Sequence, residues 1–245
     1  MMYWSILLPL LATAAILLFW VLLKARPTGL EKMLITKHSF FASFTKKERN
    51  RTLTSLHIFM GVGLLLDWVY NAGFTQIYTS TNDYNTAYLF ISFFFALAIN
   101  DVYFYFSHRF MHWKPIFTRV HYIHHQSHEP NPWSAFSFHS IEAVLQIAIV
   151  PIVALIIPIH IYVLIGFSSF MLLVSVYGHC GYELRANKPS IFNIFNNSIH
   201  HNQHHQFVKY NYGLYLNIWD RIFKTNHPKY TEVTDEFKQK ERGEE

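Results

Sequence analysis

Long runs of apolar residues, separated by short polar segments, dominate the pattern of this 245-residue chain. A helix that crosses the hydrocarbon core of a bilayer needs about 20 mostly apolar residues, with a range of roughly 17–25. Because lipid offers no hydrogen-bonding partners, each such run has to satisfy its own backbone polar groups as a helix. The runs that meet this length are Tyr3–Leu23, Leu53–Tyr70, Thr86–Phe106, Ile141–Ile159 and Ile161–Gly178. The pattern therefore predicts an all-α, multi-pass membrane protein.

The apolar runs and the polar segments between them predict four parts of the chain. Residues 1–23 form an N-terminal transmembrane anchor, and residues 24–52 form a basic linker. Residues 53–228 hold the other apolar runs in one catalytic domain, and residues 229–245 form a polar tail that we expect to fray. A cleaved signal peptide is the alternative for the first part. We favour an anchor because no Lys or Arg precedes the apolar run, which continues beyond its small residues.

Composition and charge orient this helical bundle. The chain is 51% hydrophobic and 14% charged, whereas soluble proteins carry about 25% charged residues. Its 20 Lys and Arg residues all lie in residues 24–52, in residues 107–140 or after Gly178. If Pro158 marks a tight or re-entrant return, every cation lies on one face, which the positive-inside rule makes cytoplasmic. Topology and anionic head groups then explain the formal net charge of +5, and no nucleic-acid-binding motif is present.

Three blocks of histidines fall on this same predicted face. Residues 108–112 read HRFMH, residues 121–125 read HYIHH, and residues 201–205 read HNQHH. Offsets of three and four bring side chains together on a helix, and imidazole is a good ligand for iron, zinc or copper. Eight ligands are too many for one tetrahedral ion, so the blocks predict a cytoplasmic, histidine-rich cap that holds two metal ions. The expected ligands are His108, His112, His121, His124, His125, His201, His204 and His205.

Four more histidines on this face are candidate ligands. His179 follows the last apolar run and is the best of them. His139 stands where the fourth run begins, so it could bind metal or support a ligand. His128 and His200 are next to the triplets but point off the face that the triplets share, so we favour support of a ligand or contact with solvent over metal binding.

Two carboxylates are candidate catalytic residues. Asp101 lies seven residues before His108, on the same helical stripe, and could receive the second N–H of an imidazole. An ionised group inside a membrane helix is costly unless it has a partner, which supports this role. Glu183 lies four residues after His179 and could supply an oxygen ligand. The alternatives are a helix-end Asp that faces water and a surface Glu.

These residues restrict the chemistry. The chain has no HExxH motif, and a hydrolytic zinc site needs only about three ligands and a water. An all-nitrogen, redox-capable pair of ions beneath lipid suits activation of O2 and attack on an unactivated C–H bond. The alternative is a histidine-rich metal transporter or storage protein. A transporter should place ionisable residues along a path through its helices. The predicted spans hold few, namely His57, Asp67 and Asp101, with Glu142 at an entrance.

The segment from Asp101 to about Thr225 resembles the fatty acid hydroxylase / sterol desaturase superfamily, and within it the C5-sterol desaturase-like group. The resemblance rests on the order HxxxH, HxxHH, HxxHH, on the segment PNPWSAFSFHSIEA, and on the ending NYG…WDR…T. It implies a membrane enzyme with a non-haem di-iron centre that uses O2 to hydroxylate or desaturate a sterol, fatty acyl or related lipid. The same eight histidines, and His179, would be the iron ligands.

The resemblance also implies an external electron donor. No cytochrome b5 domain is fused to the chain, so electrons would come from a separate cytochrome b5- or ferredoxin-type protein with its reductase. Where the fatty acid 2-hydroxylase branch has a further histidine, this chain has Glu183, which argues against that branch. Nitrogen sites bind zinc more tightly than Fe²⁺, so a purified sample could carry zinc.

Overall fold

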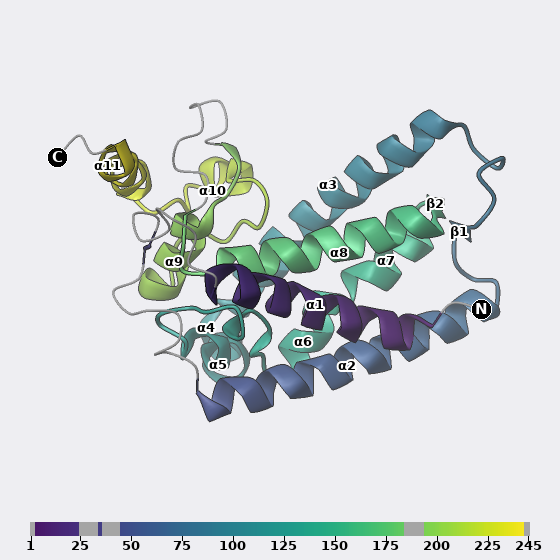
Figure 1. Ribbon diagram of the computed structural model, residues 1–245, viewed down its shortest axis with the longest axis horizontal. Coiled ribbons are helices and arrows are strands. Elements are labelled where there is room, and N and C mark those ends of the chain that lie inside the picture. The colour runs from purple at the N-terminus through teal and green to yellow at the C-terminus, as the bar shows by residue number, and fades with distance from the viewer. Residues whose placement is uncertain (1–2, 25–33, 36–44, 184–193, 243–245) are drawn as a thin grey trace.

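A computed structural model describes residues 3–24, 34–35, 45–183 and 194–242, and these residues are mostly helical (Figure 1). Within them, four helices are long and apolar enough to cross a membrane. These helices are α1 (Trp4–Lys24), α2 (Lys46–Asn71), α3 (Thr86–Met111) and α8 (Ile161–Gly178). They correspond to the first, second, third and fifth predicted spans, so the multi-pass helical class is confirmed.

The fourth predicted span is not one continuous helix. Its residues form two short consecutive helices, α6 (Ser140–Ile147) and α7 (Ile149–Ile156). The physical reason is Pro151, which has no N–H to continue the hydrogen-bond ladder and whose ring crowds the preceding turn. Together the two helices cover 140–156, a stretch shorter than any of the four long helices.

The two ends of the bundle differ in character. At one end, β1 (Ile77–Tyr78) and β2 (Ile159–His160) pair in parallel, so the loop after α2 and the turn before α8 lie together, as the topology required. The other end carries all three histidine blocks (Figure 1). The short helices there are α4 (Lys114–Ile116), η2 (Phe117–His121), α5 (Tyr122–His125), α9 (Ser198–Phe207) and α10 (Ile218–Ile222). That this end is cytoplasmic stays a prediction from the Lys and Arg distribution.

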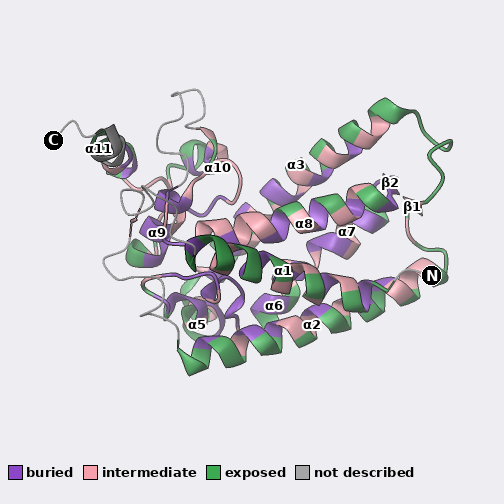
Figure 2. Ribbon diagram, viewed as in Figure 1, coloured by how far each residue is buried: buried purple, intermediate pink, exposed green. Residues whose placement is uncertain are grey.

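Many residues on the outer faces of the long helices are exposed (Figure 2). Large apolar side chains are exposed on the outer faces of the long helices, and Phe90 and Phe94 of α3 are each 65% exposed. Buried polar residues gather instead at the histidine end, where His204 and His205 are fully buried. Contiguous exposed apolar surface of this extent needs lipid to cover it. The structure therefore agrees with an integral membrane protein.

The first helix is held against the second by close packing and a cap. A Cβ on Gly63 would lie 2.5 Å from backbone atoms of Trp4 and Ser5, so only glycine allows this approach. Asp67 of α2 accepts hydrogen bonds from the backbone N–H groups of Trp4 and Ser5, at 2.8 and 3.1 Å. These donors begin α1 and have no partner within the helix. The intramembrane Asp67 is thus explained by capping α1.

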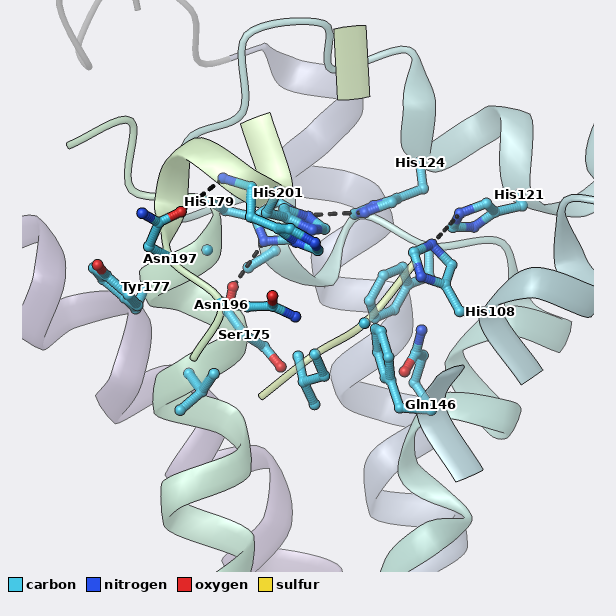
Figure 3. A pocket seen from close by; sticks show the side chains of 18 residues that line it. His108, His121, His124, Gln146, Ser175, Tyr177, His179, Asn196, Asn197 and His201 are labelled. Carbon is cyan, nitrogen blue, oxygen red and sulfur yellow. Dashed lines mark hydrogen bonds between the residues drawn. The ribbon is translucent and has the colours of Figure 1, made fainter. Parts of the chain in front are cut away.

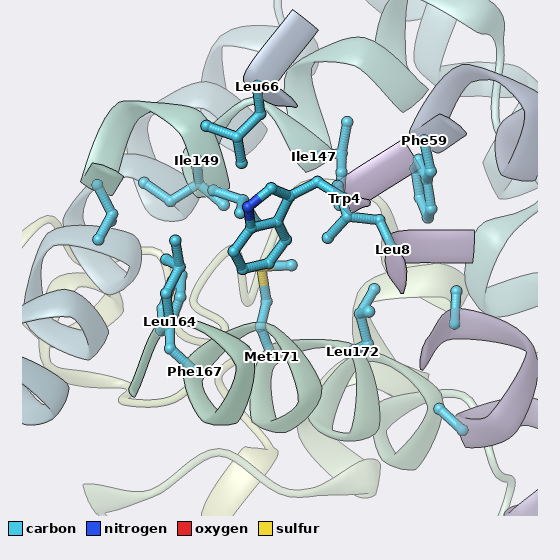
Figure 4. Packing of buried hydrophobic residues seen from close by; sticks show 14 of the residues in the cluster. Trp4, Leu8, Phe59, Leu66, Ile147, Ile149, Leu164, Phe167, Met171 and Leu172 are labelled. Carbon is cyan, nitrogen blue, oxygen red and sulfur yellow. The ribbon is translucent and has the colours of Figure 1, made fainter. Parts of the chain in front are cut away.

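A continuous apolar core fills the bundle below the histidine end (Figure 4). Trp4 and Leu8 of α1 meet Phe59 of α2, Ile147 of α6 and Phe167 of α8 there, all of them buried. Every long helix except α3 contributes one of these side chains, and α3 adds Ala96 nearby. This packing fixes the helices from which the histidine-bearing segments emerge.

Two of the predicted parts take a different form. The tail that we expected to fray forms α11 (Tyr230–Arg242), whose Tyr230 hydroxyl donates to Asn197 Oδ1 at 3.3 Å. Of the predicted linker, Lys46 and the residues after it begin α2, capped by Thr45, and Leu34 pairs with Tyr182. The rest of the linker lies outside the described residues.

Candidate metal centre

Nine histidines of the described chain converge at one end of the bundle in two groups. Within each group the ligand nitrogens lie within 4.8 Å of one another. The first group is His108, His112, His121, His125 and His204. The second group is His124, His179, His201 and His205. These nine are the eight histidines of the three blocks plus His179, so residues up to 97 positions apart in sequence meet in space.

Each HxxHH block contributes two histidines to one group and one histidine to the other. In the block at 121–125, the first and last histidines belong to the first group and His124 belongs to the second. In the block at 201–205, the first and last belong to the second group and His204 belongs to the first. On a helix, residues i and i+4 share a face, while i+3 points about 100° away from i+4. Each block can therefore present ligands to two neighbouring ions.

Local structure places each block. His108 lies in the last turn of α3, and His112 caps its C-terminus. His121 ends the π-helical turn η2, and α5 continues directly from it. The third block lies on α9. Asn197 caps the start of this helix, because its side-chain oxygen accepts the N–H of His200 at 2.9 Å.

Hydrogen bonds behind the rings fix which nitrogen faces the interior. The Nδ1–H groups of His108, His179 and His204 donate to the carbonyl oxygens of Tyr212, Ser175 and Tyr210, at 2.9, 2.7 and 2.6 Å respectively. His121 Nδ1 donates to Glu142 Oε1 at 2.7 Å. Since a carbonyl oxygen can only accept, Nδ1 carries the proton and the lone pair lies on Nε2. Such outer partners orient metal-binding histidines and raise their basicity.

The donor set fits metal ions. His108 Nε2 and His121 Nε2 lie 3.1 Å apart, and both rings carry their proton on Nδ1. Two lone pairs therefore face each other with no proton between them, which is unfavourable unless a cation lies between. Elsewhere Nε2 atoms also approach closely, at 3.0 Å between His179 and His201. His112 Nε2 is buried without a hydrogen-bond partner.

Burial keeps these imidazoles neutral. It lowers the pKa of His179 to about 4, with a smaller effect from His108. It also lowers the pKa of His124, His201 and His205 well below the ordinary value, and the neighbouring rings act in the same direction. Only the neutral ring has a lone pair to offer, so protons compete little with a metal at neutral pH.

Three candidate histidines lie outside both groups, and we remove them from the ligand set. His128 is exposed to solvent. His139 caps α6, because its Nδ1 accepts the N–H of Ile141 at 3.2 Å. His200 is fully buried, but its Nε2 faces Asp220 Oδ2 at 3.3 Å. A position near a metal ligand in the sequence therefore does not mean that the side chain points into the metal site.

The two candidate carboxylates also have other partners. Asp101 accepts the backbone N–H groups of Tyr215 and Leu216 and the indole N–H of Trp219, at 3.1, 3.2 and 3.0 Å. The prediction that it holds an imidazole was wrong, and it instead ties the C-terminal segment to α3. Glu183 is buried and accepts the hydroxyl of Tyr177 at 2.8 Å, and it belongs to neither group.

Sequence reasoning assigned no catalytic role to Glu142, the carboxylate that contacts one of the nine grouped imidazoles. A signal was present, because Glu142 stands in the SFHSIEA segment, at the start of an apolar run where an unpaired carboxylate would be costly. Glu142 is fully buried on α6, and its Oε1 is the acceptor for His121. It takes the role that we expected of Asp101.

A second carboxylate that sequence reasoning missed is Asp220. It orders the segment that supplies the Tyr210 and Tyr212 carbonyl groups behind His204 and His108. Asp220 of α10 is fully buried and accepts the backbone N–H groups of Tyr212 and Gly213, both at 2.8 Å. It also accepts the Thr225 hydroxyl at 2.7 Å. A Cβ on Gly213 would lie 2.5 Å from the carbonyl oxygen of Leu216, so glycine is required there. The hydrogen bonds of Asp220 thus order the NYG…WDR…T ending so that the Tyr212 carbonyl accepts from His108.

A cavity opens directly against the imidazoles (Figure 3). His108, His121, His124, His179 and His201 line it on the metal side. Phe104, Ala135, Phe138, Val174 and Leu214 line much of the remainder. The cavity can therefore hold an apolar group beside the nitrogen ligands, which suits oxidation of a hydrocarbon.

Comparisons with known proteins agree with this chemistry. The family model described as Fatty acid hydroxylase matches residues 93–225. The chain is 31% identical to lathosterol oxidase of Mus musculus over 153 residues, which is 61% of this chain and 50% of that protein. It is 35% identical to lathosterol oxidase of Homo sapiens over 127 residues, 51% and 42% of the two chains.

A third relative covers more of the chain. The Delta(7)-sterol 5(6)-desaturase erg31 of Schizosaccharomyces pombe is 28% identical over 173 residues, 69% of this chain and 56% of that protein. The chain thus spans about half the length of the curated relatives that it matches. No solved structure matches it significantly.

Proposed function

Because this chain belongs to the fatty acid hydroxylase family, within the C5-sterol desaturase-like group, we propose that it is a membrane-bound oxidoreductase that hydroxylates or desaturates a lipid with O2. The observation that carries the proposal is the convergence of nine imidazoles in two adjacent groups. Each group would hold one iron ion in a non-haem di-iron centre. When bound, the two ions would supply activation of O2 and oxidation of an unactivated C–H bond.

The protein's own residues support this chemistry in three ways. The Nδ1–H bonds of His108, His121, His179 and His204 hold the rings with Nε2 facing inward. The aromatic rings of Phe104 and Phe138 hold apolar substrate beside the imidazoles and exclude water. The lipid-covered helices let a substrate arrive from the bilayer.

The relatives support a sterol as the first substrate to test, because two of them are named for lathosterol and one for Delta(7)-sterols. Hydroxylation converts R–H, O2, two electrons and two protons into R–OH and water. Desaturation uses the same inputs, removes two hydrogens and yields two waters. Both need two external electrons, which a separate cytochrome b5- or ferredoxin-type protein with its reductase would supply.

The geometry gives less support to the transporter alternative. A permeation path would need ionisable groups that face a passage through the long helices. Asp67 is engaged by the N-terminus of α1, and Asp101 by the C-terminal segment. His57 is exposed on α2. None of these three residues belongs to either histidine group.

The test is lipid profiling by mass spectrometry of cells with and without the gene, under ¹⁸O2. A lipid that gains one ¹⁸O reports hydroxylation, and a lipid that loses two hydrogens reports desaturation. His124→Ala and His204→Ala, one from each group, should abolish the product while His57→Ala retains it. A full yield of product from both ligand variants would refute the metal assignment, and no altered lipid in any comparison would refute the activity.

A further inference from the structure

We propose that a second cavity, deeper in the bundle, binds a neutral oxygen-bearing group of the lipid, and that Gln146 makes the hydrogen bond to it. This inference rests on the proposed function, because it names the chemistry of the substrate for the same site. It predicts that an alcohol, ketone or ester is recognised in preference to a hydrocarbon or a carboxylate.

The second cavity adjoins the first, because the two share part of their lining. Phe104, Phe138, Gln146, Ser175 and Leu214 line both cavities. Beyond these shared residues, the second cavity is enclosed by apolar side chains that include Phe59 of α2, Ile147 of α6 and Leu172 of α8. Figure 3 shows Gln146 on the side of the site away from the ring of His124, next to His108. A molecule that fills both cavities therefore passes the Gln146 side chain.

Gln146 is the polar group in this lining that lacks a partner. The other polar residues of the second cavity are engaged, since Asn100 donates to the Tyr215 hydroxyl at 2.7 Å and Ser175 donates to the Met171 carbonyl at 3.0 Å. Gln146 is half-buried, and among the described residues none forms a hydrogen bond with its amide. A polar group in apolar surroundings is costly unless it finds a partner. A ligand in the cavity can provide that partner.

Charge restricts the ligand to neutral groups. Of the described residues that line the two cavities, none is Lys or Arg. A carboxylate or phosphate taken into the second cavity, which no histidine lines, would be desolvated without a cation to pair with it, at a large cost in free energy. An amide offers two N–H donors and one carbonyl acceptor, which suits a hydroxyl, ketone or ester oxygen.

The position of Gln146 also relates the polar group to the reacting carbon. Gln146 lies four residues after Glu142, which contacts His121. The α6 helix rises about 6 Å over that interval. A group bound by Gln146 would therefore lie close to the imidazoles, and its hydrogen bond would select which carbon of the lipid faces them.

The experiment measures binding of three probes that differ only in their end group, namely hexadecan-1-ol, hexadecane and hexadecanoate. Each unlabelled probe competes with labelled hexadecan-1-ol for the purified full chain in nanodiscs. We expect the alcohol to bind more tightly than both others, and Gln146→Leu to weaken alcohol binding by roughly tenfold while alkane binding is kept. Gln76→Leu, the same change at an exposed position at the opposite end of the bundle, should bind as the unaltered protein does.

Several outcomes would overturn the inference. They are equal binding of alcohol and alkane by the unaltered protein, hexadecanoate binding as tightly as the alcohol, absence of binding by all three, or an unchanged alcohol preference in Gln146→Leu. If Gln146→Leu fails to fold, Gln146→Met keeps the side-chain length and removes the hydrogen-bonding atoms. Binding needs no turnover, so a selective but inactive protein would contradict the proposed function and leave this inference standing.

Discussion

At the scale of single residues, the candidate centre depends on acceptors behind the imidazoles as much as on the imidazoles. Carbonyl groups hold three of the rings and the carboxylate of Glu142 holds that of His121. Glu142 differs from the carbonyls because a carboxylate, when it is ionised, strengthens the basicity of the ring in front of it. Changes at this residue should therefore affect metal binding more than they affect the fold.

Glu142→Gln keeps the size of the side chain and an acceptor oxygen but removes the possibility of negative charge. We expect metal affinity to fall by about 10- to 100-fold, measured as metal bound per chain during dialysis against graded chelator. Glu232→Gln, the same change on an exposed position of α11, is the control. Unchanged metal retention in Glu142→Gln would show that the carboxylate has no role in tuning the site.

Asp220→Asn tests the hydrogen bonds that order the NYG…WDR…T ending. The amide can accept only with its oxygen, so one of the Tyr212 and Gly213 N–H groups loses its acceptor. Unfolding stability should fall by about 1–3 kcal/mol, and metal retention should fall as well because the Tyr212 carbonyl no longer holds His108. Asp83→Asn, at an exposed loop position, is the control. A stability loss with full metal retention would restrict Asp220 to a structural role.

Spacing was sufficient to predict the histidines that meet, whereas hydrogen-bond partners were not predictable. HxxxH and HxxHH determine faces of a helix, and these local offsets do not depend on the rest of the fold. The partners of Asp101, by contrast, lie more than 110 positions later in the chain. The direction of His200 depends on Asp220, which belongs to another helix. Such contacts are set by tertiary packing, on which a single sequence carries little information.

At the scale of elements, apolar length predicted the four long helices of the described chain, but it did not predict the break where a proline interrupts the fourth run. Pro151 divides the fourth run into α6 and α7. The break leaves α6 as a separate short helix that carries both Glu142 and Gln146. A hydropathy average over the whole run does not register one proline, although Pro151 itself is plain in the sequence.

Contact between α1 and α2 can be tested with two glycines of the same helix. Gly63→Ala would place a Cβ 2.5 Å from the backbone of α1, so we expect a loss of about 1–3 kcal/mol in unfolding free energy. Gly61→Ala meets nothing within 4 Å, so its higher helix propensity should give a gain of up to about 1 kcal/mol. Chemical unfolding in detergent, followed by circular dichroism, compares the two. Equal effects would contradict the packing of α1 on Gly63.

At the scale of the whole molecule, topology brings three separated histidine blocks to one end, and the charge pattern predicts that this end is cytoplasmic. Lys114→Cys lies at the histidine end and Asn82→Cys lies in the loop at the opposite end, and both positions are exposed. In sealed vesicles with the cytoplasmic face outward, a membrane-impermeant thiol reagent should label the first and spare the second until permeabilisation. The native Cys180 is buried and serves as the background. The reverse labelling would invert the orientation.

The reciprocal sharing of the two HxxHH blocks has a consequence for how the centre is loaded. Each block would contribute ligands to both ions, so the first ion to bind orders rings on α5 and α9 that the second ion also needs. Loading should then be cooperative, with chains that hold two ions or none outnumbering chains that hold one. Native mass spectrometry during a substoichiometric metal titration would resolve the three populations. A large singly loaded population would mean that the two halves fill independently.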